Sequence, residues 1–175
     1  MVIATTERLV LRHLAPGDAA ALGLVFGDPE VMHFGDGPQA PEWVEGWLRR
    51  VVEGDYVERG YGPYGVAERT GGTLVGYCGL FYFPDLGGRP EVELGYRLAR
   101  AWWGRGYATE AALAVRDHAF DALGLTRLVA LIDPANLASA RVAEKIGMRR
   151  VGEVMLPGYT HPDHLYALHR PPPHP

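Results

Sequence analysis

Glu93-Leu94-Gly95-Tyr96-Arg97-Leu98, followed five residues later by Gly104-Arg105-Gly106-Tyr107-Ala108-Thr109-Glu110-Ala111, is the stretch that decides the fold. Its first part predicts an apolar strand, and its second part predicts a glycine turn that opens an alanine-rich helix. A strand–glycine–helix junction presents free backbone N–H groups to an anion, usually a phosphate. The stretch therefore predicts a site for a phosphorylated ligand.

The glycine spacing fits neither of the two common nucleotide-binding motifs. A Walker P-loop has four residues between its glycines, whereas one residue separates Gly104 from Gly106. A dinucleotide fingerprint requires a third glycine three residues after Gly106, and position 109 is threonine. These two motifs therefore leave the phosphorylated ligand unidentified.

Length and composition limit the classes of protein that fit this chain. Its 175 residues suit a single domain, expected over residues 1–170, and the proline-rich tail 171–175 is expected to be disordered. The net charge of −4 argues against a general nucleic-acid binder. No apolar run reaches the roughly 18 residues that span a membrane, and no signal peptide is recognisable. With its one cysteine, Cys78, the chain is expected to be cytoplasmic, with neither nucleic acid nor membrane as a partner.

Periodicity and turn residues predict an α+β protein with a mixed sheet, because some strands are linked by hairpins and others by helices. Strands are predicted at residues 7–14, 60–68, 73–83, 91–98, 128–132, 150–156 and 164–169. Helices are predicted at residues 18–26, 41–55, 106–123 and 137–146.

Three blocks of sequence together resemble the GCN5-related N-acetyltransferase (GNAT) superfamily, and within it the Rim-type branch of ribosomal-protein N-acetyltransferases. The blocks are Thr6-Glu7-Arg8-Leu9-Val10-Leu11-Arg12, the stretch Glu93–Ala111 quoted above, and Asn136-Leu137-Ala138-Ser139-Ala140-Arg141-Val142-Ala143-Glu144-Lys145-Ile146-Gly147-Met148. The resemblance implies about seven strands in a largely antiparallel, twisted sheet, a splay between the fourth and fifth strands, and about four flanking helices. It also implies transfer of an acetyl group from acetyl-CoA to a primary amine through a ternary complex, without a metal.

The resemblance also implies which residues hold acetyl-CoA. Backbone N–H groups of the turn and first helical turn would bind the pyrophosphate, and the edge of the preceding strand would pair with the pantetheine. The implied residues are Gly104, Arg105, Gly106, Tyr107, Ala108 and Thr109 for the pyrophosphate, Tyr96, Arg97 and Leu98 for the pantetheine, and Asn136, Ser139 and Arg141 from the third block. Asn136 is equally open to interpretation as a helix N-cap. Ala101 departs from the Gln or Arg usual in the family, and Arg100 or Arg105 is a candidate for the missing charge.

Amine acetylation needs a base for the amine and an acid for the leaving thiolate. Glu93 is the expected general base, acting directly or through a water, whereas Glu91 is expected to be a solvated or salt-bridged strand residue. Ser139 is the expected general acid, with a capping serine as the alternative, and Tyr166 is the second candidate. A backbone N–H near Leu94 would polarise the thioester carbonyl.

Several alternatives stay open from sequence alone. The acceptor is either a protein N-terminal α-amine or a small-molecule amine, and His33 and Phe34 are candidates to contact it. The protein is expected to be a monomer or homodimer. The competing functions are a non-catalytic acyl-CoA-binding regulatory module and a nucleotide-binding domain with a mainly parallel sheet. A group of histidines near Asp163 is spaced too loosely to indicate a metal site; its members are His161, His164, His169 and His174.

Overall fold

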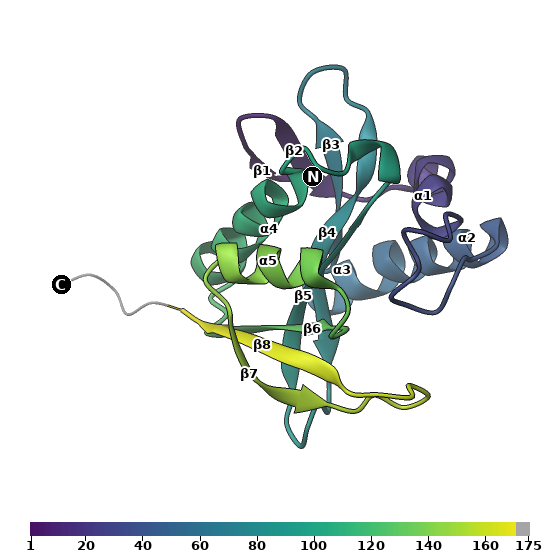
Figure 1. Ribbon diagram of the computed structural model, residues 1–175. Helices are drawn as coiled ribbons and strands as arrows, with labels where there is room; N and C mark the ends of the chain where they lie inside the picture. Colours follow the sequence, from purple (N-terminus) through teal and green to yellow (C-terminus); the bar gives the residue numbers. More distant parts are fainter. Residues whose placement is uncertain (171–175) are drawn as a thin grey trace.

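A computed structural model describes residues 1–170, and the predicted disordered tail 171–175 lies outside the described residues. Eight strands form one sheet in the order β1-β2-β3-β4-β5-β6-β8-β7 (Figure 1). They are β1 (Val2–Thr5), β2 (Leu9–His13), β3 (Pro63–Glu68), β4 (Leu74–Phe83), β5 (Glu91–Leu98), β6 (Arg127–Ile132), β7 (Arg149–Val154) and β8 (Asp163–His169). Every neighbouring pair is antiparallel except β5 and β6. The mixed α+β sheet is therefore confirmed, and the mainly parallel nucleotide-binding fold is excluded.

The first strand is absent from the sequence-based prediction. β1 pairs antiparallel with β2, with Val2 opposite Arg12 and Thr5 opposite Val10. A four-residue segment offers too few alternations to be recognised as a strand, so its pairing with β2 decides its conformation. The sheet consequently has eight strands where seven are predicted.

The helices are α1 (Ala19–Phe26), α2 (Pro41–Arg50), α3 (Tyr56–Glu58), α4 (Tyr107–Asp117) and α5 (Leu137–Lys145). Two predicted continuous helices change winding near their C-terminal ends. A π-helical turn, Val51–Asp55, continues α2 into α3, and another, His118–Ala122, continues α4. A π turn adds one residue per backbone ring without interrupting the apolar face, so side-chain spacing alone does not reveal it.

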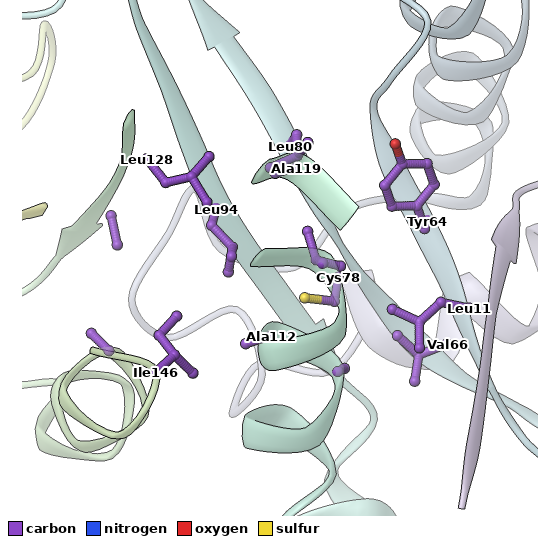
Figure 2. Packing of buried hydrophobic residues seen from close by; sticks show 14 of the residues in the cluster. Leu11, Tyr64, Val66, Cys78, Leu80, Leu94, Ala112, Ala119, Leu128 and Ile146 are labelled. Atoms are coloured by element: carbon purple, nitrogen blue, oxygen red, sulfur yellow. The ribbon is translucent and has the colours of Figure 1, made fainter. Parts of the chain in front are cut away.

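The sheet carries helices on both faces. Helices α4 and α5 cover one face and α1 and α2 cover the other (Figure 1). Figure 2 shows Cys78 and Leu94 of the sheet lying against Ala112 of α4, which is fully buried. Small alanines let α4 approach the sheet closely. Cys78 is itself fully buried and burial raises the pKa of its thiol, so it is a packed thiol and not a nucleophile.

The two parallel strands separate almost as soon as they meet. Eight residue pairs join β4 to β5, whereas Glu93 opposite Val129 is the pair that joins β5 to β6. Beyond this point β5 has a partner strand on its β4 side, and its other edge faces the gap toward β6. The predicted splay between the fourth and fifth predicted strands is therefore confirmed, and Glu93 stands at its origin.

Candidate active site

The glycine turn between β5 and α4 has the backbone geometry that an anion site requires. Gly104 and Gly106 adopt left-handed φ values of 73° and 79°, a conformation that side chains disfavour. Helix α4 starts at Tyr107, so the N–H groups of its first turn have no partner within the helix. A Cβ added to Gly104 would meet no atom within 4 Å. The space over this turn is therefore open to a phosphate.

Arg8 supplies a positive charge beside the turn, and the sequence interpretation did not assign it this position. Its Nη1 donates to the backbone oxygen of Arg105 at 2.9 Å, and its Nη2 would lie 3.4 Å from a Cβ on Gly106. Of the two arginines considered for this charge, Arg100 pairs with Asp28 at 3.2 Å, whereas Arg105 lies over the ring of Trp102. The signal for Arg8 was its place in the first of the three blocks that resemble the GNAT superfamily.

Glu110 joins the first block of sequence to the second. Its carboxylate accepts hydrogen bonds from Thr6 Oγ1 at 2.6 Å and from the backbone N–H of Arg8 at 2.9 Å, and it forms an ion pair with the Arg8 guanidinium. Burial alone would raise the pKa of Glu110, but these hydrogen bonds lower it. The pair fixes the N-terminal strand region against the first turn of α4 and so holds the glycine turn in place.

Tyr107 points into the protein, away from a ligand on the turn. Its side chain is 8% exposed, and its hydroxyl donates to Glu68 at 2.9 Å. Of the residues predicted to hold the pyrophosphate, Tyr107 thus has only its backbone N–H available for that role. The side-chain contribution beside the turn comes from Arg8 and Arg105.

Glu93 is the partly buried acid of the site. Its Oε1 accepts a hydrogen bond from the backbone N–H of Leu131 at 3.3 Å, so the carboxylate bridges the gap between β5 and β6. Burial raises the pKa of Glu93 to about 7; the Leu131 hydrogen bond and Arg97 oppose this effect, and Asp163 adds to it. A carboxylate that titrates near neutral pH is suited to general base catalysis. Glu91, in contrast, is a buried ion-pair residue that contacts Arg89 and Arg127, each at 3.0 Å.

Tyr96 and Arg97 project from opposite faces of β5. Tyr96 packs on the α4–α5 face, whereas Arg97 donates to Tyr77 on the α1–α2 face at 3.0 Å. A Cβ on Gly35 would come within 2.5 Å of Arg97 Nη2, so the guanidinium lies against the loop between α1 and α2. The predicted role of Arg97 beside the pantetheine is consequently available to its backbone, while its side chain belongs to the opposite face.

Ser139 connects the start of α5 to β5. Its Oγ lies 3.2 Å from the hydroxyl of Tyr96, and its backbone N–H donates to Asn136 Oδ1 at 3.1 Å. The structure therefore confirms Asn136 as the N-cap of α5; its contact with a ligand stays a prediction. The sequence interpretation treated Tyr96 as a backbone contact and missed its phenol, although the alternation of β5 places Tyr96 on the same face as Leu94.

Tyr166 and Arg141 lie on a different side of α5 from Ser139. Both line a surface hollow between α5 and the β7–β8 hairpin. Residues 139 and 141 of a helix point about 200° apart, which explains the separation. Of the two candidate acids, Ser139 lies within hydrogen-bond distance of a β5 side chain, whereas Tyr166 belongs to the buried core on the α4–α5 face.

The β7–β8 loop and the α1–α2 loop approach each other on the sheet face that carries Glu93. Burial raises the pKa of Tyr159, in the β7–β8 loop; the charges of Asp36, Asp163 and Glu93 raise it further, and Arg97 opposes them. Asp36 belongs to the α1–α2 loop, which also contains His33 and Phe34. Contact between the acceptor and His33 or Phe34 therefore stays a prediction.

Of the four histidines near the C-terminus, the three that lie within the described residues do not gather. His161 lies 2.9 Å from Asp133 and close to Asp163. His164 lines the hollow beside Tyr166, and His169 contacts Arg127 at 2.8 Å. His174 lies outside the described residues. That the protein uses no metal stays a prediction.

Comparison with known proteins identifies the family. The family model described as "Acetyltransferase (GNAT) domain" matches residues 8–149, which include the glycine turn, Glu93 and Ser139. This chain belongs to the GNAT acetyltransferase family. The acetyltransferase shares 42% identity over 150 residues with YkkB of Bacillus subtilis (strain 168), an uncharacterised protein, with 82% of this chain and 83% of YkkB covered.

Solved structures agree with this assignment. A GNAT-family acetyltransferase from Bacillus anthracis superimposes with a TM-score of 0.81 at 29% identity, covering 97% of this chain and 98% of that one. The ribosomal L7/L12 N-acetyltransferase RimL has the same TM-score of 0.81 at 19% identity, covering 97% and 94%. The aminoglycoside acetyltransferase AAC(6')-Ib, solved in complex with coenzyme A, reaches 0.74 at 20%, covering 93% and 95%. The last two likenesses show the shared fold alone.

Within residues 1–170, the acetyltransferase has no helix with the length and apolar character that a membrane span requires.

Proposed function

We propose that the protein is a cytoplasmic N-acetyltransferase of the Rim-type branch that transfers the acetyl group of acetyl-CoA directly to a primary amine. The observation that carries the proposal is Glu93, a partly buried carboxylate with a pKa of about 7 at the origin of the splay. The Rim-type assignment rests on the three sequence blocks, of which the first two are joined by Arg8 and Glu110.

The residues of the splay and the turn fit acetyl-CoA. The open space at Gly104, the free N–H groups at the start of α4 and the nearby Arg8 guanidinium suit a pyrophosphate. The edge of β5 beyond Glu93 is available to pair with the pantetheine amides. GNAT enzymes use acetyl-CoA, which supplies the acetyl group as a thioester, and one structural neighbour is a coenzyme A complex.

Glu93 removes the proton that keeps the acceptor amine from acting as a nucleophile. A primary amine is mostly an ammonium ion at neutral pH, so attack requires a base whose pKa lies near the working pH. Burial sets the pKa of Glu93 in that range. The Leu131 N–H holds one carboxylate oxygen, which leaves the other free to take the proton, either directly or through a water.

Ser139 is the proposed donor of the proton to the departing thiolate, with Tyr96 behind it. The two hydroxyl groups lie 3.2 Å apart on the α4–α5 face of β5. The helix cap uses the backbone N–H of Ser139, so the hydroxyl proton remains available for donation. Tyr96 can then replenish or orient that proton.

Replacing Ser139 with alanine is expected to lower kcat about 10- to 100-fold, the lower part of the range for proton transfer, because a thiolate is already a fair leaving group. The backbone cap from Asn136 survives this change, so the melting temperature should stay within a few degrees. Steady-state thiol release with saturating acetyl-CoA measures the effect. A greater loss in Tyr166→Phe than in Ser139→Ala would transfer the role to Tyr166.

A screen for thiol release tests the proposed function itself. Purified protein with acetyl-CoA is presented with small amines, aminoglycosides and peptides that have free N-termini. We expect acetyl-dependent thiol release with at least one amine and a matching mass gain of one acetyl group on that acceptor. Tight coenzyme A binding without turnover on any acceptor would instead support the non-catalytic acyl-CoA-binding module.

A further inference from the structure

Arg97, on β5, is a half-buried cation whose hydrogen-bond donors are mostly unused. A guanidinium has five N–H donors, and Nη1 of Arg97 donates one of them to the hydroxyl of Tyr77 at 3.0 Å. Among residues 1–170, no carboxylate lies within 4.0 Å of its nitrogens. Within the same residues Nε and Nη2 have no hydrogen-bond partner, yet neither is among the side-chain atoms that are sealed from solvent. An incoming anion can therefore reach donors on this guanidinium.

Arg97 stands on the same face of β5 as the proposed catalytic base. Residues two apart on a strand share a face, so Glu93, Gly95 and Arg97 form one row. A Cβ added to Gly95 would lie 3.8 Å from the carboxyl carbon of Glu93, so this carboxyl group points along the strand toward Arg97. Each of the two charges shifts the pKa of the other toward its charged form. Because the residue between them is a glycine, no β5 side chain separates the acid from the guanidinium.

The position of the two proposed proton donors leaves this face for the acceptor. Ser139 and Tyr96 lie on the α4–α5 face, where they are proposed to serve the departing thiolate. On the opposite face, a Cβ on Gly35 would come within 2.5 Å of Arg97 Nη2, so the α1–α2 loop packs against the guanidinium. Tyr159 of the β7–β8 loop is exposed and senses the charge of Arg97. An acceptor that enters between these loops meets Arg97 on its way to the base.

The charges of the site favour a carboxylate over a phosphate as the anion. A carboxylate has one negative charge and matches the planar fork of a guanidinium with two parallel hydrogen bonds. A phosphate dianion would meet the same single cation and, in addition, the negative charge of Glu93, which is close enough to act on Arg97. One accessible cation beside an acid therefore suits an anion with one charge.

We infer that the acceptor is an amine that also carries a carboxylate: the Arg97 guanidinium binds the carboxylate while the amine lies at Glu93. This inference rests on the proposed function and narrows its acceptor. A free amino acid has this chemistry, and so does a peptide with an acidic residue near its N-terminus. Polyamines and aminoglycosides would bring a second cation toward Arg97, so they are expected to be poor acceptors.

Pairs of acceptors that differ only in the carboxylate test the inference. Initial rates of thiol release are compared for ω-amino acids of two to six carbons, for L-amino acids and for the amide of each. Peptides with aspartate or asparagine at their second position form the peptide arm. We expect kcat/KM for at least one acid to exceed that of its amide by about 10- to 100-fold, as for a hydrogen bond to a charged group. The arm that shows the excess identifies the source of the carboxylate.

The basicity of the amines works against the expected result. An amino acid amide has a less basic amine than the acid, so at a given pH more of the amide is in the reactive neutral form. An excess for the acid therefore cannot come from basicity. Equal or lower values for the acid in every pair, or better turnover of diamines than of amino acids, overturn the inference.

The variant Arg97→Gln removes the cation and keeps a side chain that can contact Tyr77. We expect the ratio of acid to amide to fall toward one, and Arg97→Lys to retain part of it, because lysine keeps the charge without the planar fork. The ratio is taken at one pH, since loss of Arg97 also raises the pKa of Glu93. Arg49→Gln, at an exposed arginine of α2, is the matched control. A preference that survives in Arg97→Gln, or is lost in Arg49→Gln, overturns the inference.

The variant Gly35→Ala keeps every charge and displaces the guanidinium. Its methyl group would meet the flexible end of Arg97 at 2.5 Å, and Gly35 has no left-handed φ that alanine would strain. We expect a lower ratio of acid to amide at an unchanged melting temperature. Gly46→Ala in α2, where a Cβ meets no atom within 4 Å, is the control. A ratio in Gly35→Ala equal to that of the wild type overturns the place assigned to the carboxylate.

Two further results separate the possible explanations. An absence of thiol release with every acceptor overturns the proposed function and this inference together, whereas turnover of amines with equal values for acid and amide overturns only the inference. Isothermal titration of Arg97→Gln with coenzyme A covers the cofactor. We expect the affinity of the wild type, because the guanidinium lies on the acceptor face; a loss of tenfold or more would assign the Arg97 side chain to the cofactor and overturn the inference.

Discussion

Replacing Glu93 with glutamine is expected to lower kcat/KM for acetyl transfer about 100- to 10,000-fold, the range usual for loss of a general base. Glutamine keeps the size of the side chain and an oxygen that can accept the Leu131 N–H, but it cannot take a proton from the ammonium group. Thiol release at saturating acetyl-CoA measures the loss. An undiminished rate would remove Glu93 from the mechanism.

The pH dependence of the wild type provides the corresponding control. Because burial raises the pKa of Glu93 to about 7 from its ordinary 4.5, kcat/KM should rise with pH through an inflection near 7 that the variant lacks. Between pH 4.5 and 7 the folded state binds more protons than the unfolded chain, so Glu93 makes the free energy of unfolding fall as pH rises. Glu93→Gln removes that penalty, and it should be more stable than the wild type at pH 8 by roughly 3 kcal/mol at most. Lower activity in a more stable protein cannot come from unfolding.

Replacing Gly104 with alanine is expected to weaken coenzyme A binding about tenfold or more. The new Cβ would enter the open space over the turn, where the pyrophosphate is proposed to lie, and it would strain a φ of +73° by about 1–2 kcal/mol. Isothermal titration with coenzyme A measures the affinity.

Gly72→Ala is the matched control for this strain. Gly72 lies in the β3–β4 hairpin with a φ of +69°, and a Cβ there also meets no atom within 4 Å. Both variants should lose similar stability, but only Gly104→Ala should lose affinity for coenzyme A. Equal affinities in the two variants would show that no phosphate lies on the Gly104 turn.

The sequence was informative wherever function depends on backbone shape. Glycine positions, the strand before them and the helix after them are local properties, so the turn at 104–106 and the cap at Asn136 could be predicted from residue type and order. The splay was expected from the resemblance alone, because strand alternation says nothing about which neighbouring strands part. β1 was missed because its conformation depends on pairing with β2.

Side-chain partners far apart in the sequence were the part that could not be predicted. Arg8 reaches Glu110 and the glycine turn across about a hundred residues, and Tyr96 meets Ser139 across 43. Asp163 had been considered only with neighbouring histidines, whereas the sheet order places it beside Asp133 and on the face of Glu93.

By itself the sequence determined the strand–glycine–helix junction, the mixed α+β class and Glu93 as the acid on the strand that feeds the turn, because these follow from local backbone preference and alternation. Tertiary structure alone decided the chemistry of that acid. Burial in the gap between β5 and β6 sets the pKa of Glu93, and strand order sets which charges face it. Desolvation and Coulomb interactions depend on distances in space, and no pattern along the chain contains them.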